Sequence, residues 1–318
     1  MLTVLKFGGS SLADADRIRT AARCCAEKLQ KGQRALMVVS AMGDTTDELA
    51  RLAREINPAP PKRESDALMS TGEQQSAALM AITLDSMGVP AMSFTGWQSG
   101  IFTDSVHTDA SPEVTFPSRL EDALDKGVVP VVAGYQGIDV LGNITTLGRG
   151  GSDTTAVLLA AALKADACEI YTDVDGIYTA DPRLVKDAKK LDAIDYRDML
   201  ALSLAGSQVL HHKSVSLAMH NNVEILLLSP YGLGGSRVTS LDEASRQRFA
   251  GVTRSASDCT VTLAGKACTA ELLPMLTLDL SDAGVRVTGG GTRDNCVYIR
   301  TMPEQLEMAL QTVHDMYF

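Results

Sequence analysis

Hydrophobic and polar positions follow two different periods along the first three quarters of the chain. The apolar run Leu2–Phe7 predicts a buried strand, and a second continuous run, Ala35–Val39, is typical of a parallel strand covered on both faces. Between them, apolar residues recur at the spacing of a one-sided helix: Ile18, Ala21, Ala22, Cys25 and Leu29. The pattern therefore predicts a strand, a helix and a second strand.

The same alternation continues further along the chain. Helices are predicted at 119–126 and 154–164, and each precedes an apolar strand, at 128–133 and 169–172; a further strand is predicted at 223–228. Strands that alternate with helices of this length form βαβ units. We therefore expect an α/β fold with a doubly wound, mostly parallel sheet, whose functional residues follow the strand ends.

The remainder of the chain predicts a second, smaller module. A glycine-rich linker, Gly232–Ser236, is followed by a short charged helix, Asp242–Phe249. Beyond it, the pattern predicts a small α+β module: strand 260–263, helix 269–283, strand 285–288, a glycine-rich hairpin loop 289–295, strand 296–300 and helix 303–316. We expect a catalytic domain at 1–235, a linker helix at 236–249 and a C-terminal domain at 250–318.

Length and composition agree with a folded chain of two domains. The 318 residues are 45% hydrophobic and 21% charged. The chain has 29 basic and 39 acidic residues, so its net charge is −10. This negative charge argues against nucleic acid as a partner. The longest apolar run, Ala156–Leu163, is too short to span a bilayer, and no secretory signal is apparent, so we expect a cytoplasmic protein.

Neither cysteine nor histidine spacing indicates a metal site. The six cysteines include no CxxC pair, so they are predicted to be small buried side chains. The five histidines lie far from any nucleophile-elbow pattern, and the adjacent pair His211-His212 has no spaced partner that would indicate zinc. We predict packing or surface roles for them.

Small polar segments follow the first two predicted strands. Lys6–Ser11 places a lysine and paired glycines before a helix, where backbone N–H groups and the helix dipole attract a phosphate. It is neither a Walker A loop nor GxGxxG, and an ordinary tight turn is the alternative. In the second segment, which begins at Ser40, hydroxyl and N–H groups also collect; its alternative is a helix start capped by Thr46 or Asp47.

Two further segments offer groups that suit an amino acid. Glu73, ahead of a helix predicted at 76–84, is a carboxylate available for an ammonium group, or else a complement to the helix dipole. Arg149 lies beside two glycines at the start of an apolar helix capped by Ser152 or Asp153. The arginine can bind a carboxylate through two hydrogen bonds, and the glycines expose N–H groups to anions.

A fifth segment, Tyr171–Arg183, turns from a strand end into a polar loop with two tyrosines and several acidic groups. Such a loop suits adenine and ribose. Its DxDG sequence lacks the remaining ligands of a calcium loop, and we predict no metal-binding residue.

These five segments, in this order and spacing, resemble the aspartokinases of the amino acid kinase superfamily over residues 2–235. The resemblance implies the amino acid kinase fold, with ACT-like C-terminal modules that commonly pair, and hence a homodimer. It implies nucleotide contacts at Lys6, Gly8, Gly9, Thr172, Asp173, Tyr178 and Arg183, to which we add Ser10 and Gln208 as candidates. It implies substrate contacts at Thr46, Glu73, Arg149, Gly150, Gly151 and Ser152, to which we add Ser40. Asp153 matches an acidic residue that organises the catalytic lysines.

The chain departs from the family pattern in two places. Gln208 stands where the family usually carries a lysine that contacts ATP, and Lys213 follows five residues later as a possible substitute. Only residues 251–318 remain for the regulatory region, enough for one incomplete ACT-like module. Feedback control by lysine or threonine is therefore left open.

The resemblance implies that MgATP and L-aspartate give 4-phospho-L-aspartate and ADP. A free carboxylate, with a pKa of about 3.9, needs no general base at neutral pH. We therefore expect catalysis by Lys6 and Asp153 through charge and alignment, helped by the N–H groups of Gly8 and Gly9, with Mg²⁺ held on the ATP phosphates. The alternatives are a kinase for another small amino-acid carboxylate and an impaired, ligand-sensing homologue. A dehydrogenase is disfavoured because GxGxxG is absent.

Overall fold

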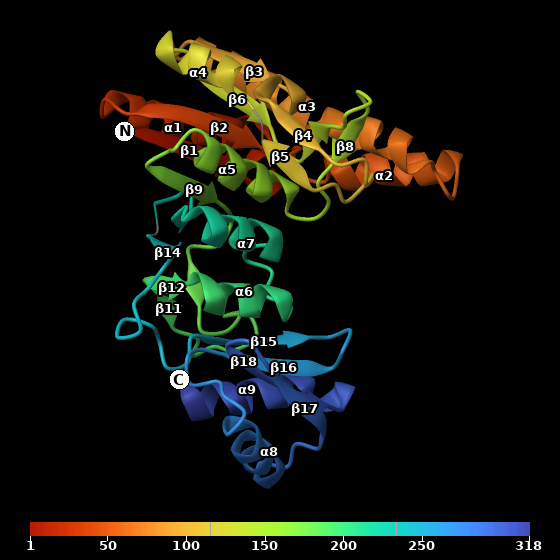
Figure 1. Cartoon of the computed structure of the whole chain (residues 1–318), viewed down its shortest axis with the longest axis vertical. Helices are drawn as coiled ribbons and strands as arrows, with labels where there is room; N and C mark the ends of the chain where they lie inside the picture. The colour runs from red at the N-terminus through yellow and green to blue at the C-terminus, as the bar shows by residue number, and fades with distance from the viewer. Residues whose placement is uncertain (115, 233) are drawn as a thin grey trace. The chain divides into compact units, whose positions relative to one another are not determined.

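The computed structural model describes residues 1–114, 116–232 and 234–318. The chain divides into two compact units: the first comprises Met1–Asp175 and Ile225–Gly234, and the second comprises Gly176–Glu224 and Gly235–Phe318 (Figure 1). Leu233 of the predicted linker lies outside the described residues. Within those residues, no helix has the length and apolar character needed to span a membrane.

A parallel sheet forms the centre of the first unit. Its order is β13-β9-β1-β2-β6-β3, and every neighbouring pair runs parallel. The strands are β1 (Leu2–Phe7), β2 (Arg34–Val39), β3 (Ala91–Phe94), β6 (Val129–Ala133), β9 (Ala167–Tyr171) and β13 (Ile225–Leu228). This confirms the predicted parallel α/β fold.

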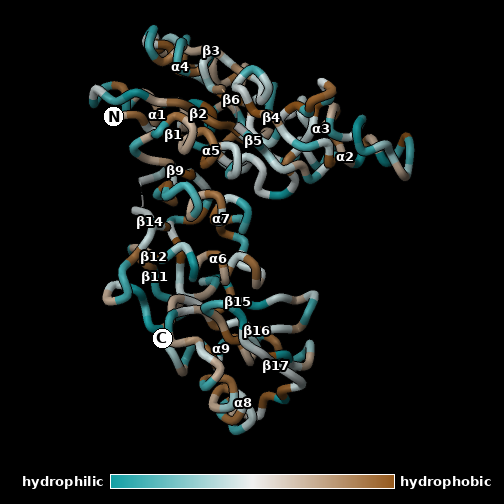
Figure 2. Tube along the Cα trace, viewed as in Figure 1, coloured by the Kyte–Doolittle hydropathy of each residue, from teal (hydrophilic) through white to brown (hydrophobic). Residues whose placement is uncertain are grey.

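Helices cover both faces of this sheet. On one face, α1 (Ala15–Gln30) and α3 (Lys62–Ser86) share a buried core with Leu5 and Met37. On the other face, α5 (Gly151–Ala162) contacts β1, β2 and β9, and α4 (Ser118–Asp125) packs beside β6. Figure 2 shows hydrophobic stretches in β2 and α5, among other elements. Burial on both faces explains why these strands are continuous apolar runs.

Three features of the first unit differ from the sequence-based expectation. Strand β3 was not predicted. A small sheet, β5-β4-β7-β8, was not predicted; its last strand leads into the turn before α5. Its strands are β4 (Ile101–Thr103), β5 (Pro112–Val114), β7 (Gln136–Ile138) and β8 (Ile144–Thr146). The helix predicted at 76–84 is much longer, since α3 begins at Lys62. Gly72 within it lies against β2's loop, where an added Cβ would come 2.8 Å from the Ala41 side chain.

The second unit contains a four-stranded antiparallel sheet with two helices. Three of these strands and both helices were predicted for the C-terminal module, and the strand at Gly251–Ser255 was not. The sheet order is β15-β16-β18-β17, formed by Gly251–Ser255, Thr260–Ala264, Cys296–Thr301 and Val287–Arg293. Helices α8 (Leu272–Asp282) and α9 (Leu306–Tyr317) pack on it. The unit also holds β10 (Ile177–Tyr178), β11 (Lys190–Leu191), β12 (Ala193–Asp195), β14 (Gly235–Thr239), α6 (Tyr196–Leu204) and α7 (His212–Asn221).

Two predictions in the second unit are wrong. Residues 236–249 form no helix: β14 occupies the start of this segment, and Arg246 inserts its guanidinium group into a buried ion pair with Asp198 at 2.6 Å. The glycine run at 289–293 is part of β17 and not a loop. Glycine is needed at Gly290, because an added Cβ would lie 2.8 Å from the carbonyl oxygen of Tyr298.

The compact units also divide the chain at a different place from the expected domains. Residues 176–224 belong to the compact unit that contains the C-terminal sheet, whereas the sequence analysis assigns them to the catalytic domain. The division into domains at 1–235 and 250–318 stays a prediction.

Candidate active site

A pocket of about 500 Å³ opens in the first unit, where β1 and β2 end and α5 begins. Its lining contains most residues that the sequence analysis selected for phosphate and amino-acid binding. The lining residues are Lys6, Gly8, Gly9, Ser40, Ala41, Gly43, Thr46, Asp47, Glu73, Tyr135, Gly148, Arg149, Gly150, Gly151, Ser152 and Asp153. The early lysine and the arginine-glycine turn therefore share one pocket.

Lys6 and Asp153 form an ion pair in this pocket. Lys6 is the penultimate residue of β1, and its Nζ lies 2.5 Å from Oδ1 of Asp153 in the first turn of α5. Both side chains are largely buried, with exposed fractions of 10% and 14%. Because charge attraction is stronger away from water, Asp153 holds the ammonium group in place at the pocket wall.

The two glycines after β1 have different surroundings. The N–H of Gly8 donates to the carbonyl of Tyr171 at 3.2 Å, so it is already bonded, which weighs against its predicted contact with phosphate. Gly9 begins a 3₁₀ turn, Gly9–Leu12, that includes Ser10. A Cβ on Gly9 would lie 2.8 Å from the carbonyl oxygen of Ala41, so glycine is required where the loops after β1 and β2 meet.

Glu73 lies in the interior of α3 and not at a helix start, so the alternative of a dipole complement is wrong. Its exposed fraction is 3%, and Oε1 accepts a hydrogen bond from the N–H of Ala41 at 3.2 Å. Oε2 has no hydrogen-bond partner in the described residues. Burial raises the pKa of this carboxyl to about 8. A cationic ligand in the pocket would satisfy the free oxygen.

The arginine-glycine turn forms another wall of the pocket. Gly148 and Gly150 both have left-handed backbone conformations, with φ of 73° and 71°. Helix α5 begins at Gly151 with Gly150 at its N-cap and no side-chain cap, so the predicted capping by Ser152 or Asp153 is wrong. The uncapped N-terminus carries partial positive charge, which suits an anion. Arg149 is exposed at the rim of this wall.

The polar segment after β2 does not cap its helix in the way expected from the sequence. Helix α2 (Thr45–Ile56) has Asp44 at its N-cap, so Thr46 and Asp47 lie in its first turn and cap nothing. Both line the pocket with Ser40, whose N–H donates to the carbonyl of Phe7 at 3.1 Å. The segment thus contributes hydroxyl groups to the pocket.

Tyr135 is a pocket residue that the sequence analysis missed. Its φ of 72° is unusual for a residue with a side chain, and its N–H donates to the hydroxyl of Thr155 at 3.1 Å. Burial raises the pKa of its phenol, and Glu73 lies close enough to add to this effect. Tyr135 closely follows β6, so the rule that sites follow strand ends could have identified it.

The predicted nucleotide residues are divided between the two units. In the first unit, the Thr172 hydroxyl donates to Asp173 at 3.0 Å, directly after β9. In the second unit, Tyr178 belongs to β10, and Gln208 is exposed between α6 and α7. The guanidinium group of Arg183 forms a bidentate ion pair with the carboxylate of Asp181. Lys213 lies in the first turn of α7.

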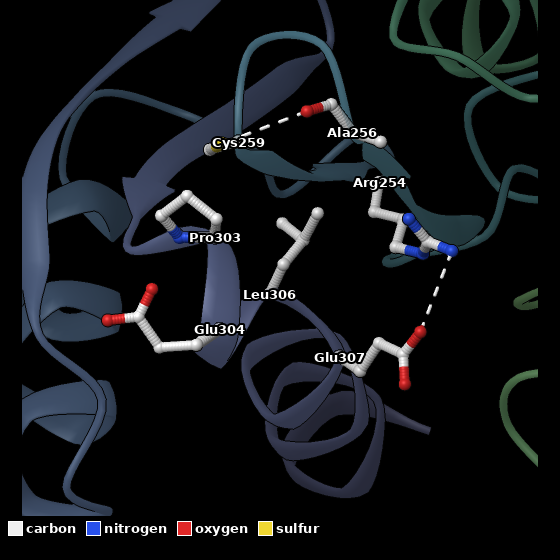
Figure 3. A pocket seen from close by; sticks show the side chains of 7 residues that line it. All are labelled: Arg254, Ala256, Cys259, Pro303, Glu304, Leu306 and Glu307. Carbon is white, nitrogen blue, oxygen red and sulfur yellow. Dashed lines mark hydrogen bonds and ion pairs between the residues drawn. The ribbon is translucent and has the colours of Figure 1, made fainter.

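A smaller pocket of about 250 Å³ lies within the second unit (Figure 3). Arg254, from β15, approaches Glu307 of α9 to 3.7 Å at one side of it, and Cys259, Pro303 and Leu306 form other parts of its wall. None of the residues selected from the sequence lines this pocket.

The described residues contain no group of three or more His, Cys, Asp or Glu side chains suited to a metal ion. Three acidic residues line the larger pocket: Asp153 pairs with Lys6, Glu73 accepts a hydrogen bond from Ala41 through Oε1 only, and Asp47 lies in the first turn of α2. This donor set fits a hard cation that arrives on nucleotide phosphates and keeps most of its waters.

The chain resembles known proteins in sequence. Residues 1–229 match the model of the amino acid kinase family. An aspartokinase from Mycolicibacterium smegmatis is 52% identical over 231 residues, which cover 72% of this chain and 55% of that protein. An aspartokinase from Mycobacterium tuberculosis is 46% identical over 269 residues, which cover 83% and 64%. The chain thus spans less than two thirds of the length of these relatives.

Solved structures agree in fold. E. coli aspartokinase III in complex with aspartate and ADP matches with a TM-score of 0.85 at 22% identity and covers 99% of both chains. The aspartate kinase from Synechocystis matches with a TM-score of 0.69 at 29% identity, over 100% of this chain and 69% of that one.

Proposed function

The chain belongs to the amino acid kinase family, and from this premise we propose that it transfers the γ-phosphoryl group of ATP to the side-chain carboxylate of L-aspartate. The products are 4-phospho-L-aspartate and ADP. One observation carries the proposal: Lys6, Glu73 and the arginine-glycine turn line the same pocket. The names of the relatives support the choice of substrate.

The amino-acid end of the substrate fits the two walls of the pocket. The unpartnered Oε2 of Glu73 is suited to the ammonium group, because a buried carboxylate without a charge partner is unfavourable. Arg149 can bind a carboxylate through two parallel hydrogen bonds. Thr46, Ser40 and Ser152 add hydroxyl groups to the same lining.

The phosphoryl group would meet the substrate near Lys6. The nucleophile is a carboxylate already ionised at neutral pH, so the protein has to align it with the phosphorus and stabilise the charge on the phosphoryl oxygens. Lys6 supplies the cation, Asp153 orients it, and the N-terminus of α5 adds a fixed dipole. The N–H of Gly8 is left out of this assignment because Tyr171 accepts it.

The proposal includes MgATP as the second substrate. When bound, Mg²⁺ would neutralise charge on the phosphates. We propose that its ligands are mainly phosphate oxygens and water, with few from the protein. Thr172 and Asp173, together with Tyr178, Arg183 and Gln208, remain the proposed nucleotide residues.

We also propose a homodimer. Its support is the ACT-like C-terminal module. On its helix α8, the apolar side chains of Met275 and Leu278 have exposed fractions of 61% and 62%, and a second copy of the chain would cover them.

Trapping the acyl phosphate with hydroxylamine tests the function directly. The purified chain is incubated with MgATP and L-aspartate, L-glutamate or their amides, and the hydroxamate and ADP are measured. We expect both products with aspartate and none with the amides, which lack the free side-chain carboxylate. Product with another amino acid instead would identify a related kinase, and nucleotide binding without any ADP would identify a ligand-sensing homologue.

A further inference from the structure

A fully buried carboxylate, Asp66, lies on α3 outside the lining of the active-site pocket. It accepts hydrogen bonds from the N–H of Thr108 at 3.0 and 3.1 Å and from the hydroxyl of Thr146 at 2.5 Å, and it contacts Nδ1 of His107 at 2.7 Å. These partners come from two separate segments, the loop between β4 and β5 and the end of β8. A buried carboxylate with this many partners joins three parts of the chain at one point.

The segment that Asp66 holds leads directly into the arginine-glycine turn. Thr146 is three residues before Arg149, and its carbonyl accepts the N–H of Ala110 at 2.9 Å. Gly148 packs so closely on the same loop that a Cβ there would lie 2.4 Å from Oδ1 of Asp109. The turn therefore depends on the loop, and the loop depends on Asp66.

Helix α3 also carries Glu73, seven residues after Asp66. Seven residues are about two turns of an α-helix, so both side chains leave the same face. Glu73 reaches the pocket and Asp66 reaches the end of β8. A single rigid helix thus connects the proposed ammonium site with the segment that carries the proposed carboxylate site.

We propose that Asp66 is a positioning residue, which ties the Arg149 turn to α3 and so fixes the separation between the groups that bind the two charged ends of the amino acid. This inference rests on the proposed function. An amino acid bridges both groups at once, and its alignment is sensitive to displacements of about 1 Å. ATP does not bridge them, so its binding should depend little on Asp66.

The variants Asp66→Asn and Thr146→Val test the proposal. Asp66→Asn keeps the size of the side chain. Thr146→Val is the milder change, because it removes only the hydroxyl that donates to Asp66. It tests the proposal in case Asp66→Asn fails to fold. We expect KM for aspartate to rise about tenfold in either variant, while KM for ATP stays within about twofold.

Asp139→Asn is the matched control. Asp139 is also buried and accepts the N–H groups of Leu141 and Asn143 at 2.9 and 2.8 Å, but in the turn that precedes β8. We expect this variant to leave both KM values unchanged. An equal rise in KM for aspartate in the control and in Asp66→Asn would overturn the proposal.

A double-mutant cycle shows whether Asp66 acts through Arg149. In an Arg149→Ala background, Asp66→Asn should change KM for aspartate by less than about twofold, because the group it positions is gone. A full additional tenfold effect would contradict the proposal.

Hydrogen exchange separates this inference from the proposed function. In the ligand-free protein, Asp66→Asn should increase the exchange rate of the amides at 147–151 at least fivefold relative to Asp139→Asn. Equal exchange in the two variants would overturn the positioning role. Absence of aspartate phosphorylation by the unmodified chain would instead overturn the function, and the exchange result would still decide the inference.

Discussion

At the scale of single residues, the paired charges of Lys6 and Asp153 set the chemistry of the pocket. Removing one member of a buried pair leaves the other charge uncompensated, whereas in the intact site the ammonium group is fixed where phosphoryl oxygens gain charge. Lys28 offers a contrast, because it is also partly buried and ion-paired, to Glu169 of β9, but lies outside the pocket.

Lys6→Ala should lower turnover about 10²-fold or more, on the scale of losing one electrostatic contact to the transition state. Steady-state release of ADP measures the effect. Lys28→Ala is the control and should retain turnover within a few-fold. Near-normal turnover in Lys6→Ala would refute the assigned role.

The raised pKa of Glu73 predicts a pH dependence of substrate binding. Below about pH 8 the ligand-free carboxyl holds a proton, which must leave when an ammonium group binds. KM for aspartate should therefore fall about tenfold per pH unit between pH 6 and 7 and level off above about 8. Measurements from pH 6 to 9 check this, and Glu73→Gln should abolish the slope. A flat profile in the unmodified protein would contradict the assignment.

The same carboxyl affects the stability of the ligand-free protein. The folded state keeps a proton that the unfolded state releases above its ordinary value of 4.5, so the free energy of unfolding should fall as pH rises from there towards about 8. Glu73→Gln should raise the melting temperature at pH 9 and change it little at pH 4. A variant with no such gain at pH 9 would show that Glu73 titrates normally.

At the scale of elements, the pocket depends on close contact between the loops after β1 and β2. The N–H of Gly43 donates to the carbonyl of Gly9 at 3.0 Å, and the N–H of Ser40 donates to that of Phe7. Neighbouring parallel strands thus bring their carboxyl ends, and the polar residues that follow, to one edge.

Gly9→Ala should separate these loops, because the new Cβ would lie 2.8 Å from the carbonyl oxygen of Ala41. We expect a loss of about 1–3 kcal/mol in the free energy of unfolding, measured by urea denaturation. Gly8→Ala is the matched neighbour, since its Cβ would meet nothing closer than Lys6 Nζ at 3.6 Å. Equal losses in the two variants would contradict this account of the loop contact.

At the scale of the whole molecule, the sequence predicted five of the six strands of the parallel sheet because they are apolar runs. It missed β3, which has only four residues, two of them exposed. It missed β7 and β8 because three residues such as Gln136–Ile138 show too little alternation to mark a strand. The start of α3 was missed because its first turns carry polar residues, and β17 because its glycines suggested a loop.

The candidate site follows the same rule. A strand end led to Lys6, and segments ahead of predicted helices led to Glu73 and Arg149; the structure brings all three to one pocket. Asp66 was not recognised, because its partners come from segments about 40 and 80 residues away and no local pattern reports them.

The central claim is that the amino-acid carboxylate and the terminal phosphate of ATP meet beside Lys6. A crystal structure with L-aspartate and a non-hydrolysable ATP analogue tests it most directly. We predict a carboxylate oxygen about 3–3.5 Å from the γ-phosphorus, with Lys6 Nζ within hydrogen-bond distance of a γ-phosphate oxygen. An aspartate bound away from Glu73 and Arg149, or a γ-phosphate remote from Lys6, would contradict the account.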